Sequence, residues 1–277
     1  MNAVRLLALD LDDTLLRSDL SISRRSKNAV KKAAAAGVTV VLASGRSLAA
    51  MEHYAVLLGM NKQAGYLICS NGSIIRDSLS GEIMYDICIE RKAALAAFDL
   101  ADAKGFAVQI YEGDIMYVSK ENEYTAYDYK LTGLRQVVVE NFRAMAAGGC
   151  RKMIVPGDPL LLNPLEKLFR SIFNGAITLF TSKPYFLEIL PANTDKGTSL
   201  EKIAGLLNIR REEVLAIGDS MNDEAMIRWA GTGVAMANSD ERIKKIADLV
   251  TEKNNDDDGV AEIIEKYILE KPAAKNE

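Results

Sequence analysis

The sequence predicts an α/β fold, in which a Rossmann-like core with a parallel sheet carries an inserted α+β domain. Two observations lead to this prediction. Short apolar runs alternate with helix-forming segments over the first 70 residues, and the same rhythm returns after residue 191. Between residues 82 and 190 the strands look more exposed and their order is less regular. Hydrophobic residues make up 49% of the 277 residues, which is enough for a sizeable core.

The first part of the chain reads as strand, helix, strand, helix, strand, which predicts parallel strands joined by right-handed crossovers. The apolar run 4–10 predicts a strand buried on both faces. Residues 24–36 form a helix in this prediction, with Ser23 as its N-cap and Gly37 just beyond its end. The remaining elements are a β-branched strand at 38–44, a helix at 47–60 and a strand at 65–69 that ends in a polar turn.

The middle part predicts a different arrangement. Residues 105–120 resemble a hairpin around Glu112, Gly113 and Asp114, and residues 176–190 read as two strands about a Ser-Lys-Pro turn. From residue 196 onward helices and strands alternate again, and residues 271–277 are expected to fray. We therefore predict a core made of residues 1–81 and 191–277 and an inserted domain at 82–190.

Composition excludes several classes of function. The net charge of −4 offers no basic surface for nucleic acid. No apolar run approaches the roughly 20 residues of a membrane helix. Three cysteines without metal-ligand spacing favour reduced packing residues in a cytoplasmic protein. The single histidine, His53, argues against a Ser-His-Asp triad or a multi-histidine zinc site.

Polar residues gather where the predicted parallel strands end, and ligands of open parallel sheets bind beyond those ends. Asp10 and Asp12 follow the first strand, and two residues spaced in this way share a face of an extended chain. Four carboxylates are expected to converge on one crevice, where a hard divalent cation such as Mg²⁺ would relieve their repulsion. The candidate residues at these strand ends are Asp10, Asp12, Ser44, Gly45, Arg46, Asn71, Asp219, Asn222 and Asp223, with Lys196 at a helix start.

Four short motifs resemble those of the haloacid dehalogenase superfamily. They are DLDDT from Asp10, LASGR at Ser44, DKG at Lys196 and GDSMND at Asp219, and they occur in the order and spacing of that family across nearly the whole chain. The insert between SNG and DKG is similar to the α/β cap of the Cof-type branch, as are SKPYFLEIL and NNDDDGVA. Asp13 stands where many members of that branch have glycine.

The resemblance implies a role for each matching residue. Asp10 would attack phosphorus to form an aspartyl phosphate, and Asp12 would act as general acid and then as general base. Ser44 and Lys196 would hold the phosphoryl oxygens. Magnesium would bind Asp10, the main-chain carbonyl of Asp12, and Asp219, with Asp223 in support. Substrate contacts are expected from Gly45, Arg46, Asn71 and Asn222.

The leading prediction is a Mg²⁺-dependent phosphatase for a small phosphorylated metabolite, expected to be a sugar phosphate. Two alternatives remain at this stage. A phosphomutase or phosphotransferase would use the same aspartyl phosphate with a cap that excludes water. A receiver-type signalling domain would also combine Asp, Lys and Mg²⁺, but it is far shorter and lacks an acid two residues after its phosphorylated aspartate.

The tyrosines at 111, 117, 124, 127 and 129 are interpreted as half-buried structural positions rather than substrate contacts. The sequence makes no prediction of oligomeric state.

Overall fold

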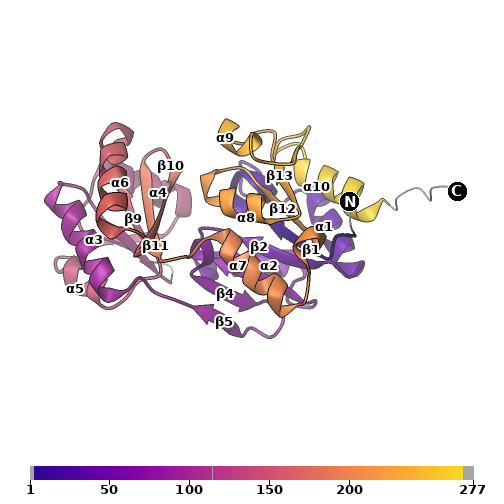
Figure 1. Cartoon of the computed structure of the whole chain (residues 1–277), viewed down its shortest axis with the longest axis horizontal. Coiled ribbons are helices and arrows are strands. Elements are labelled where there is room, and N and C mark those ends of the chain that lie inside the picture. The colour runs from indigo at the N-terminus through magenta and orange to yellow at the C-terminus, as the bar shows by residue number, and fades with distance from the viewer. Residues whose placement is uncertain (1–2, 114, 271–277) are drawn as a thin grey trace, which may run out of the picture.

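The protein consists of two lobes, each built on its own β-sheet (Figure 1). The computed structural model describes residues 3–113 and 115–270, and within these ranges the strands form one sheet of eight strands and one of six. The predicted frayed tail at 271–277 lies outside the described residues. The larger lobe is the core, and the smaller one, which the chain enters and leaves once, is the cap (Figure 1).

The core sheet confirms the predicted parallel arrangement. The six strands from β14 to β3 are parallel to one another, and β4 and β5 extend the sheet beyond β3 as an antiparallel hairpin. In sheet order the strands are β14 (Leu249–Val250), β13 (Thr232–Ala235), β12 (Val214–Gly218), β1 (Leu6–Leu9), β2 (Thr39–Ala43), β3 (Gly65–Cys69), β4 (Ile74–Asp77) and β5 (Ile83–Asp86).

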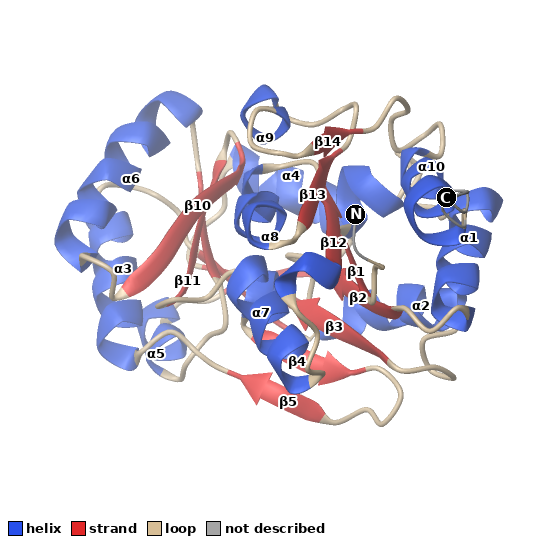
Figure 2. Ribbon diagram, turned by 45° about the vertical axis from the view of Figure 1, so that its right-hand side comes forward, coloured by secondary structure: helices blue, strands red, loops and turns tan. Residues whose placement is uncertain are grey.

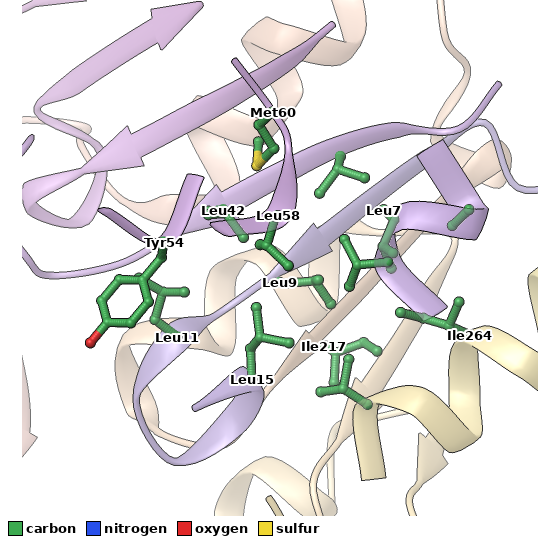
Figure 3. Packing of buried hydrophobic residues seen from close by; sticks show 14 of the residues in the cluster. Leu7, Leu9, Leu11, Leu15, Leu42, Tyr54, Leu58, Met60, Ile217 and Ile264 are labelled. Atoms are coloured by element: carbon green, nitrogen blue, oxygen red, sulfur yellow. The ribbon is translucent and has the colours of Figure 1, made fainter. Parts of the chain in front are cut away.

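Helices cover both faces of the core sheet (Figure 2). Leu7 and Leu9 of β1 pack with α1 (Arg24–Ala35), α2 (Leu48–Leu58) and α10 (Gly259–Ile264), as the close view of this cluster shows (Figure 3). Leu6 and Ala8 point to the opposite face because side chains alternate along a strand. There they pack with α7 (Lys196–Leu206), α8 (Glu224–Trp229) and α9 (Glu241–Lys244).

The first helix begins and ends where its sequence indicates. The Ser23 side chain accepts a hydrogen bond from the Ser26 amide, which satisfies one of the free N–H groups at the start of α1. Gly37 has a φ of +90°, a conformation that strains residues with a side chain but that glycine adopts freely. Glycine therefore lets the chain turn from α1 into β2.

Strand β5 lies on the core side of the predicted boundary between the domains. The prediction began the insert at residue 82, but Ile83–Asp86 pairs with β4 in the core sheet. The partly exposed β5 has little apolar periodicity, and its pairing depends on β4 rather than on a pattern of its own.

The cap contains the six-stranded sheet and four helices among its described residues. In sheet order the strands are β10 (Ile177–Lys183), β11 (Phe186–Pro191), β9 (Met153–Pro156), β6 (Gln109–Glu112), β7 (Ile115–Val118) and β8 (Arg135–Val138). Both predicted strand pairs, β6 with β7 and β10 with β11, are confirmed as antiparallel. The helices are α3 (Arg91–Ala103), α4 (Glu123–Thr132), α5 (Phe142–Ala147) and α6 (Pro159–Phe173).

The two faces of the cap sheet differ in chemistry. Alternate residues such as Ile110, Met153 and Leu187 belong to an apolar cluster with α3, α5 and α6. Their sequence neighbours Tyr111, Lys152 and Glu188 point the other way and line a cavity between cap and core. Helices α3, α5 and α6 therefore cover the apolar face, whereas α4 contributes Asp128 to the polar side, where it accepts hydrogen bonds from Gln109 and Tyr111. Of the helices within the described ranges, none has both the length and the apolar character needed to cross a membrane.

Candidate active site

The carboxyl ends of the parallel strands bring four buried charged side chains together. Asp10 follows β1, Asp219 follows β12, and Asp223 lies just before α8. Lys196 is the first residue of α7 and is fully buried, although long basic side chains are rarely buried without a partner. Asp10 and Asp219 lie close together because β1 and β12 are neighbours in the sheet, whereas Lys196 is positioned by α7, which packs against α8.

Lys196 joins two of the acids. Its Nζ donates to Asp10 Oδ1 and to Asp223 Oδ1, each at 2.6 Å. Burial alone would lower the pKa of Lys196, but the two carboxylates raise it above its ordinary value. Lys196 therefore carries a permanent positive charge at neutral pH beside Asp10.

Asp10, Asp219 and Asp223 each place a carboxylate oxygen within 4.8 Å of the others. Burial raises the pKa of Asp10 to about 7, with Asp223 adding to the shift and Lys196 opposing it. Burial, followed by repulsion from Asp10 and Asp223, also raises the pKa of Asp219 well above its ordinary value. Three acids against one lysine leave formal negative charge in a buried site, and oxygen ligands around such a charge fit a divalent cation.

Further hydrogen bonds fix these carboxylates. Thr14 Oγ1 donates to Asp219 Oδ1 at 3.1 Å, and Asp223 Oδ2 accepts from the amides of Asp219 and Ser220 at 3.0 and 3.1 Å. The sequence left open whether Thr14 only stabilises its turn. The hydrogen bond from Thr14 to Asp219 gives it a second role, because it holds the Asp219 carboxylate in place.

Two glycines allow the elements of the site to approach closely. A Cβ at Gly197 would lie 2.6 Å from the main chain of Ala225, so glycine lets α7 pack directly against α8. A Cβ at Gly218 would lie 2.6 Å from the Asp223 side chain. Glycine at these positions is what brings Lys196 and Asp223 within hydrogen-bond distance.

The Asp12 carboxylate lies outside this cluster. The sequence predicts that four carboxylates converge, but Asp12 leaves the strand direction in an irregular turn over Leu11–Leu15. Its carboxylate instead forms a two-pronged ion pair with Arg46, with Arg46 Nη2 at 2.6 Å and Nε at 2.9 Å. Of the four carboxylates predicted to converge, three come within 4.8 Å of one another, and the ion pair with Arg46 holds that of Asp12 apart from them. Asp12 still lines the same cavity as Asp10.

The remaining predicted residues lie on neighbouring loops. Ser44 is buried after β2 and accepts a hydrogen bond from the Arg46 amide, and Gly45 lines the cavity. Asn222 donates to Asn71 Oδ1 at 3.1 Å. Asn71 in turn donates to Glu188 of the cap at 2.9 Å, so it joins the two lobes instead of facing the cavity.

The cavity between core and cap has a volume of about 300 Å³. Several of its polar residues were not predicted from the sequence, namely Tyr111, Asp128, Lys152, Lys183 and Glu188 of the cap. The interpretation of Tyr111 as a structural position is incomplete, because its side chain lines this cavity. One available signal was Glu188, a single acid inside the apolar run of residues 186–190.

Asp13 contacts the cap directly. Lys183, near the end of β10, donates to Asp13 Oδ2 at 3.0 Å, and Asn238 donates to the Asp13 main-chain oxygen at 2.7 Å. Asp13 has a φ of +58°, a conformation that glycine adopts without strain. The carboxylate at this position therefore gives the protein a core–cap ion pair that glycine would not supply.

Comparisons with known proteins identify the family of the chain. The family model described as haloacid dehalogenase-like hydrolase matches residues 7–264. A putative phosphatase of Streptococcus pyogenes is 30% identical, with 96% of this chain and 99% of the relative covered. The 5-amino-6-(5-phospho-D-ribitylamino)uracil phosphatase YcsE of Bacillus subtilis is 28% identical, with 96% of both chains covered.

A solved structure shows the same arrangement of elements. The crystal structure of a haloacid dehalogenase-like hydrolase from Bacteroides thetaiotaomicron has a TM-score of 0.84 and 34% identity, with 95% of this chain and 99% of that chain covered. The family match spans both halves of the core and the whole cap. The predicted family is confirmed, and the chain belongs to the haloacid dehalogenase-like hydrolases.

Proposed function

We propose that the protein is a Mg²⁺-dependent phosphatase that hydrolyses sugar phosphates through a phosphorylated Asp10. The observation that carries this proposal is the position of Asp10. Its carboxylate lines the cavity, lies 2.6 Å from the buried ammonium of Lys196 and shares a metal-sized cluster with Asp219 and Asp223. A nucleophile, a fixed positive charge and a set of oxygen ligands are the parts that phosphoryl transfer requires.

Asp10, Asp219 and Asp223 are the side chains suited to hold Mg²⁺, together with the main-chain carbonyl of Asp12. Bound there, the cation would supply positive charge to the phosphoryl oxygens and keep the Asp10 carboxylate ionised. The fit is supported by the chemistry of the cluster, which has hard oxygen donors and an excess of negative charge in a buried place.

The chemistry is assigned to the protein's own side chains. Asp10 attacks phosphorus and forms an aspartyl phosphate as the ester oxygen departs, and Asp12 donates the proton that this oxygen needs. Water then attacks the aspartyl phosphate while Asp12 accepts its proton, which releases inorganic phosphate and restores Asp10. Lys196 and Ser44 contact the transferring oxygens. Arg46 holds the Asp12 carboxylate at the cavity wall.

The substrate class follows from the size and lining of the cavity. A volume of about 300 Å³ suits a small ligand, and the cap contributes several hydrogen-bonding side chains to its wall. The name of the Bacillus subtilis relative YcsE specifies a phosphorylated ribityl group, a sugar alcohol, which supports a polyhydroxylated substrate here. Gly45 and Arg46 line the same cavity and are assigned to substrate binding. Asn222 also lines this cavity and is assigned to substrate binding, whereas Asn71 is proposed to hold the loops around it.

Phosphate release with an Asp10→Asn variant tests the proposal. The amide is nearly isosteric, so we expect a folded protein whose kcat falls by about three orders of magnitude or more. Asp257→Asn, the same change at an exposed loop aspartate, is the control and should leave kcat unchanged. Asp10→Asn activity within tenfold of the wild type would contradict the assignment. Isomerised sugar phosphate without free phosphate would instead identify the phosphomutase alternative.

A further inference from the structure

The cap side of the cavity is a polar wall made of buried groups. Lys152 lies just before β9, and Ile154 lies within it. Phe186 and Glu188 belong to β11, and Asp128 belongs to α4. Asp128 and Glu188 are each 4% exposed and Lys152 is 9% exposed. Charged side chains that are this deeply buried lose much of their hydration, so their partners determine what else can bind beside them.

These groups are held in fixed positions. Asp128 accepts hydrogen bonds from Tyr111 Oη and from Gln109 Nε2. Lys152 donates to the main-chain oxygen of Gly45 at 3.0 Å, and its Nζ lies 4.9 Å from the centre of the Tyr111 ring. A wall whose donors and acceptors are already oriented can recognise a ligand with little loss of entropy.

The basic side chains that line the cavity are already paired with acids. Among the described lining residues there are six acids and four bases. Each of the four bases has a carboxylate partner, and the pairs are Lys152–Glu188 at 3.3 Å, Lys183–Asp13 at 3.0 Å, Arg46–Asp12 at 2.6 Å and Arg17–Asp258 at 3.5 Å. The described lining therefore has more negative than positive charge and no base that is left without an acid.

We propose that this cap wall binds the hydroxyl groups of an uncharged leaving group and discriminates against a leaving group that carries a second anion. Asp128 and Glu188 are the specificity-determining acids, and Lys152 is the base paired with Glu188. The inference rests on the proposed phosphatase function and adds to it the charge of the leaving group.

The reason is electrostatic. A phosphate dianion and a divalent cation cancel formally, so the excess of acids in the lining remains when both are bound. Hydroxyl groups can donate to Asp128 and Glu188 without cost in charge. A carboxylate or a second phosphate would meet these acids with each basic partner already engaged, and like charges placed together are repelled.

The test compares sorbitol 6-phosphate with 6-phosphogluconate, which differ only by a CH₂OH group against a carboxylate at the far end. We expect kcat/KM of the wild-type protein with Mg²⁺ to be at least about tenfold higher for sorbitol 6-phosphate. The ratio should shrink as ionic strength rises, because salt screens the repulsion. Equal values, or a preference for the acid, would overturn the inference.

Two cavity variants, one that removes a negative charge and one that removes a positive charge, make the test independent of any one residue. Asp128→Asn removes a negative charge and should narrow the ratio at least about threefold, whereas Lys152→Met removes a positive charge and should widen it. Asp102→Asn, at an exposed cap aspartate outside the cavity, is the matched control and should leave the ratio unchanged. Ratios that stay the same in both cavity variants would contradict the role of this wall.

A separate measurement distinguishes failure of the inference from failure of the proposed function. Hydrolysis of p-nitrophenyl phosphate by the wild-type protein reports the chemistry without a sugar leaving group. Mg²⁺-dependent hydrolysis with no discrimination between the two sugar derivatives would overturn the inference alone. Absence of hydrolysis with all three esters would overturn the phosphatase proposal on which it rests.

Discussion

Lys196 Nζ lies 2.6 Å from Asp10 Oδ1, although 186 residues separate the two in the sequence. The whole cap and half of the core sheet are inserted between them, yet both side chains are almost completely buried at one point. This contact places a permanent charge beside the proposed nucleophile, because the start of α7 lies beside the residue that follows β1.

Replacement of Lys196 tests how much this contact contributes. We expect Lys196→Met to lower the free energy of unfolding of the metal-free protein by about 3 to 5 kcal/mol, because Asp10 and Asp223 would lose their buried partner. The kcat for an aryl phosphate should fall at least about a hundredfold. Urea unfolding and steady-state kinetics measure the two effects, with Lys167→Met at a surface position of α6 as control. A loss below about 1 kcal/mol would show that the pair contributes little to stability.

Two glycines of α7 should respond in opposite ways to the same substitution. Gly197→Ala would place a methyl group 2.6 Å from the Ala225 main chain, so we expect lower stability and displacement of Lys196 with loss of activity. A methyl group at Gly205 would meet no described atom within 4 Å, and Gly205→Ala should raise the unfolding free energy by about 0.5 to 1 kcal/mol. Thermal unfolding of both variants decides the matter, and equal effects would contradict the packing described for α7 and α8.

Removal of one acid should separate stability from metal binding. Because Asp219 is buried beside Asp10 and Asp223, we expect Asp219→Asn to raise the Tm of the metal-free protein by about 2 to 4 °C. The same variant should lose the rise in Tm that Mg²⁺ produces in the wild type. Differential scanning calorimetry with and without Mg²⁺ provides both values. An undiminished Mg²⁺ effect would exclude Asp219 as a ligand.

The raised pKa of Asp10 predicts how the metal-free protein responds to pH. Its pKa is about 7 in the folded protein and has an ordinary value of 3.8, so the folded state retains a proton that the unfolded chain releases. Stability of the metal-free protein should therefore fall as pH rises from about 4 to about 7. The Tm gain on Mg²⁺ addition should grow over the same interval, because protons compete with the metal. Asp10→Asn should abolish the contribution of Asp10 to the pH dependence of stability. An unchanged pH profile of Tm in that variant would contradict the assignment of this effect to Asp10.

The three cysteines should differ in reactivity. Burial raises the pKa of both Cys69 and Cys150 to about 12, whereas Cys88 is exposed. Since the thiolate is the reactive form, we expect one thiol per chain to react with a disulfide reagent in the native protein and three after denaturation. Cys88→Ser should leave the native protein unreactive. Rapid reaction of two or three native thiols would contradict the burial of Cys69 and Cys150.

Much of the core could be predicted from the sequence because its signals are local. Buried parallel strands appear as short apolar runs, and β1, β2, β3 and β12 are found where such runs occur. The residues that follow these strands meet at one edge of the sheet, which is why Asp10, Asp12, Asp219 and Asp223 were predicted together, with Lys196 at a helix start beside them. The hairpin of β4 and β5 was not predicted, since partly exposed antiparallel strands depend on pairing more than on composition.

The sequence by itself determined the α/β core, the inserted cap and the motif residues, because each depends on apolar runs and residue order that can be read along the chain. Only the tertiary structure decided which side chains meet. Asp12 pairs with Arg46 instead of joining the other acids, and Glu188 of the cap reaches Asn71 of the core, 117 residues away. Such contacts depend on the exact turn after a strand and on how two sheets face each other. Neither is encoded in the spacing of residues along the chain, since the free energy of a long-range contact is determined by the packing of both of its partners.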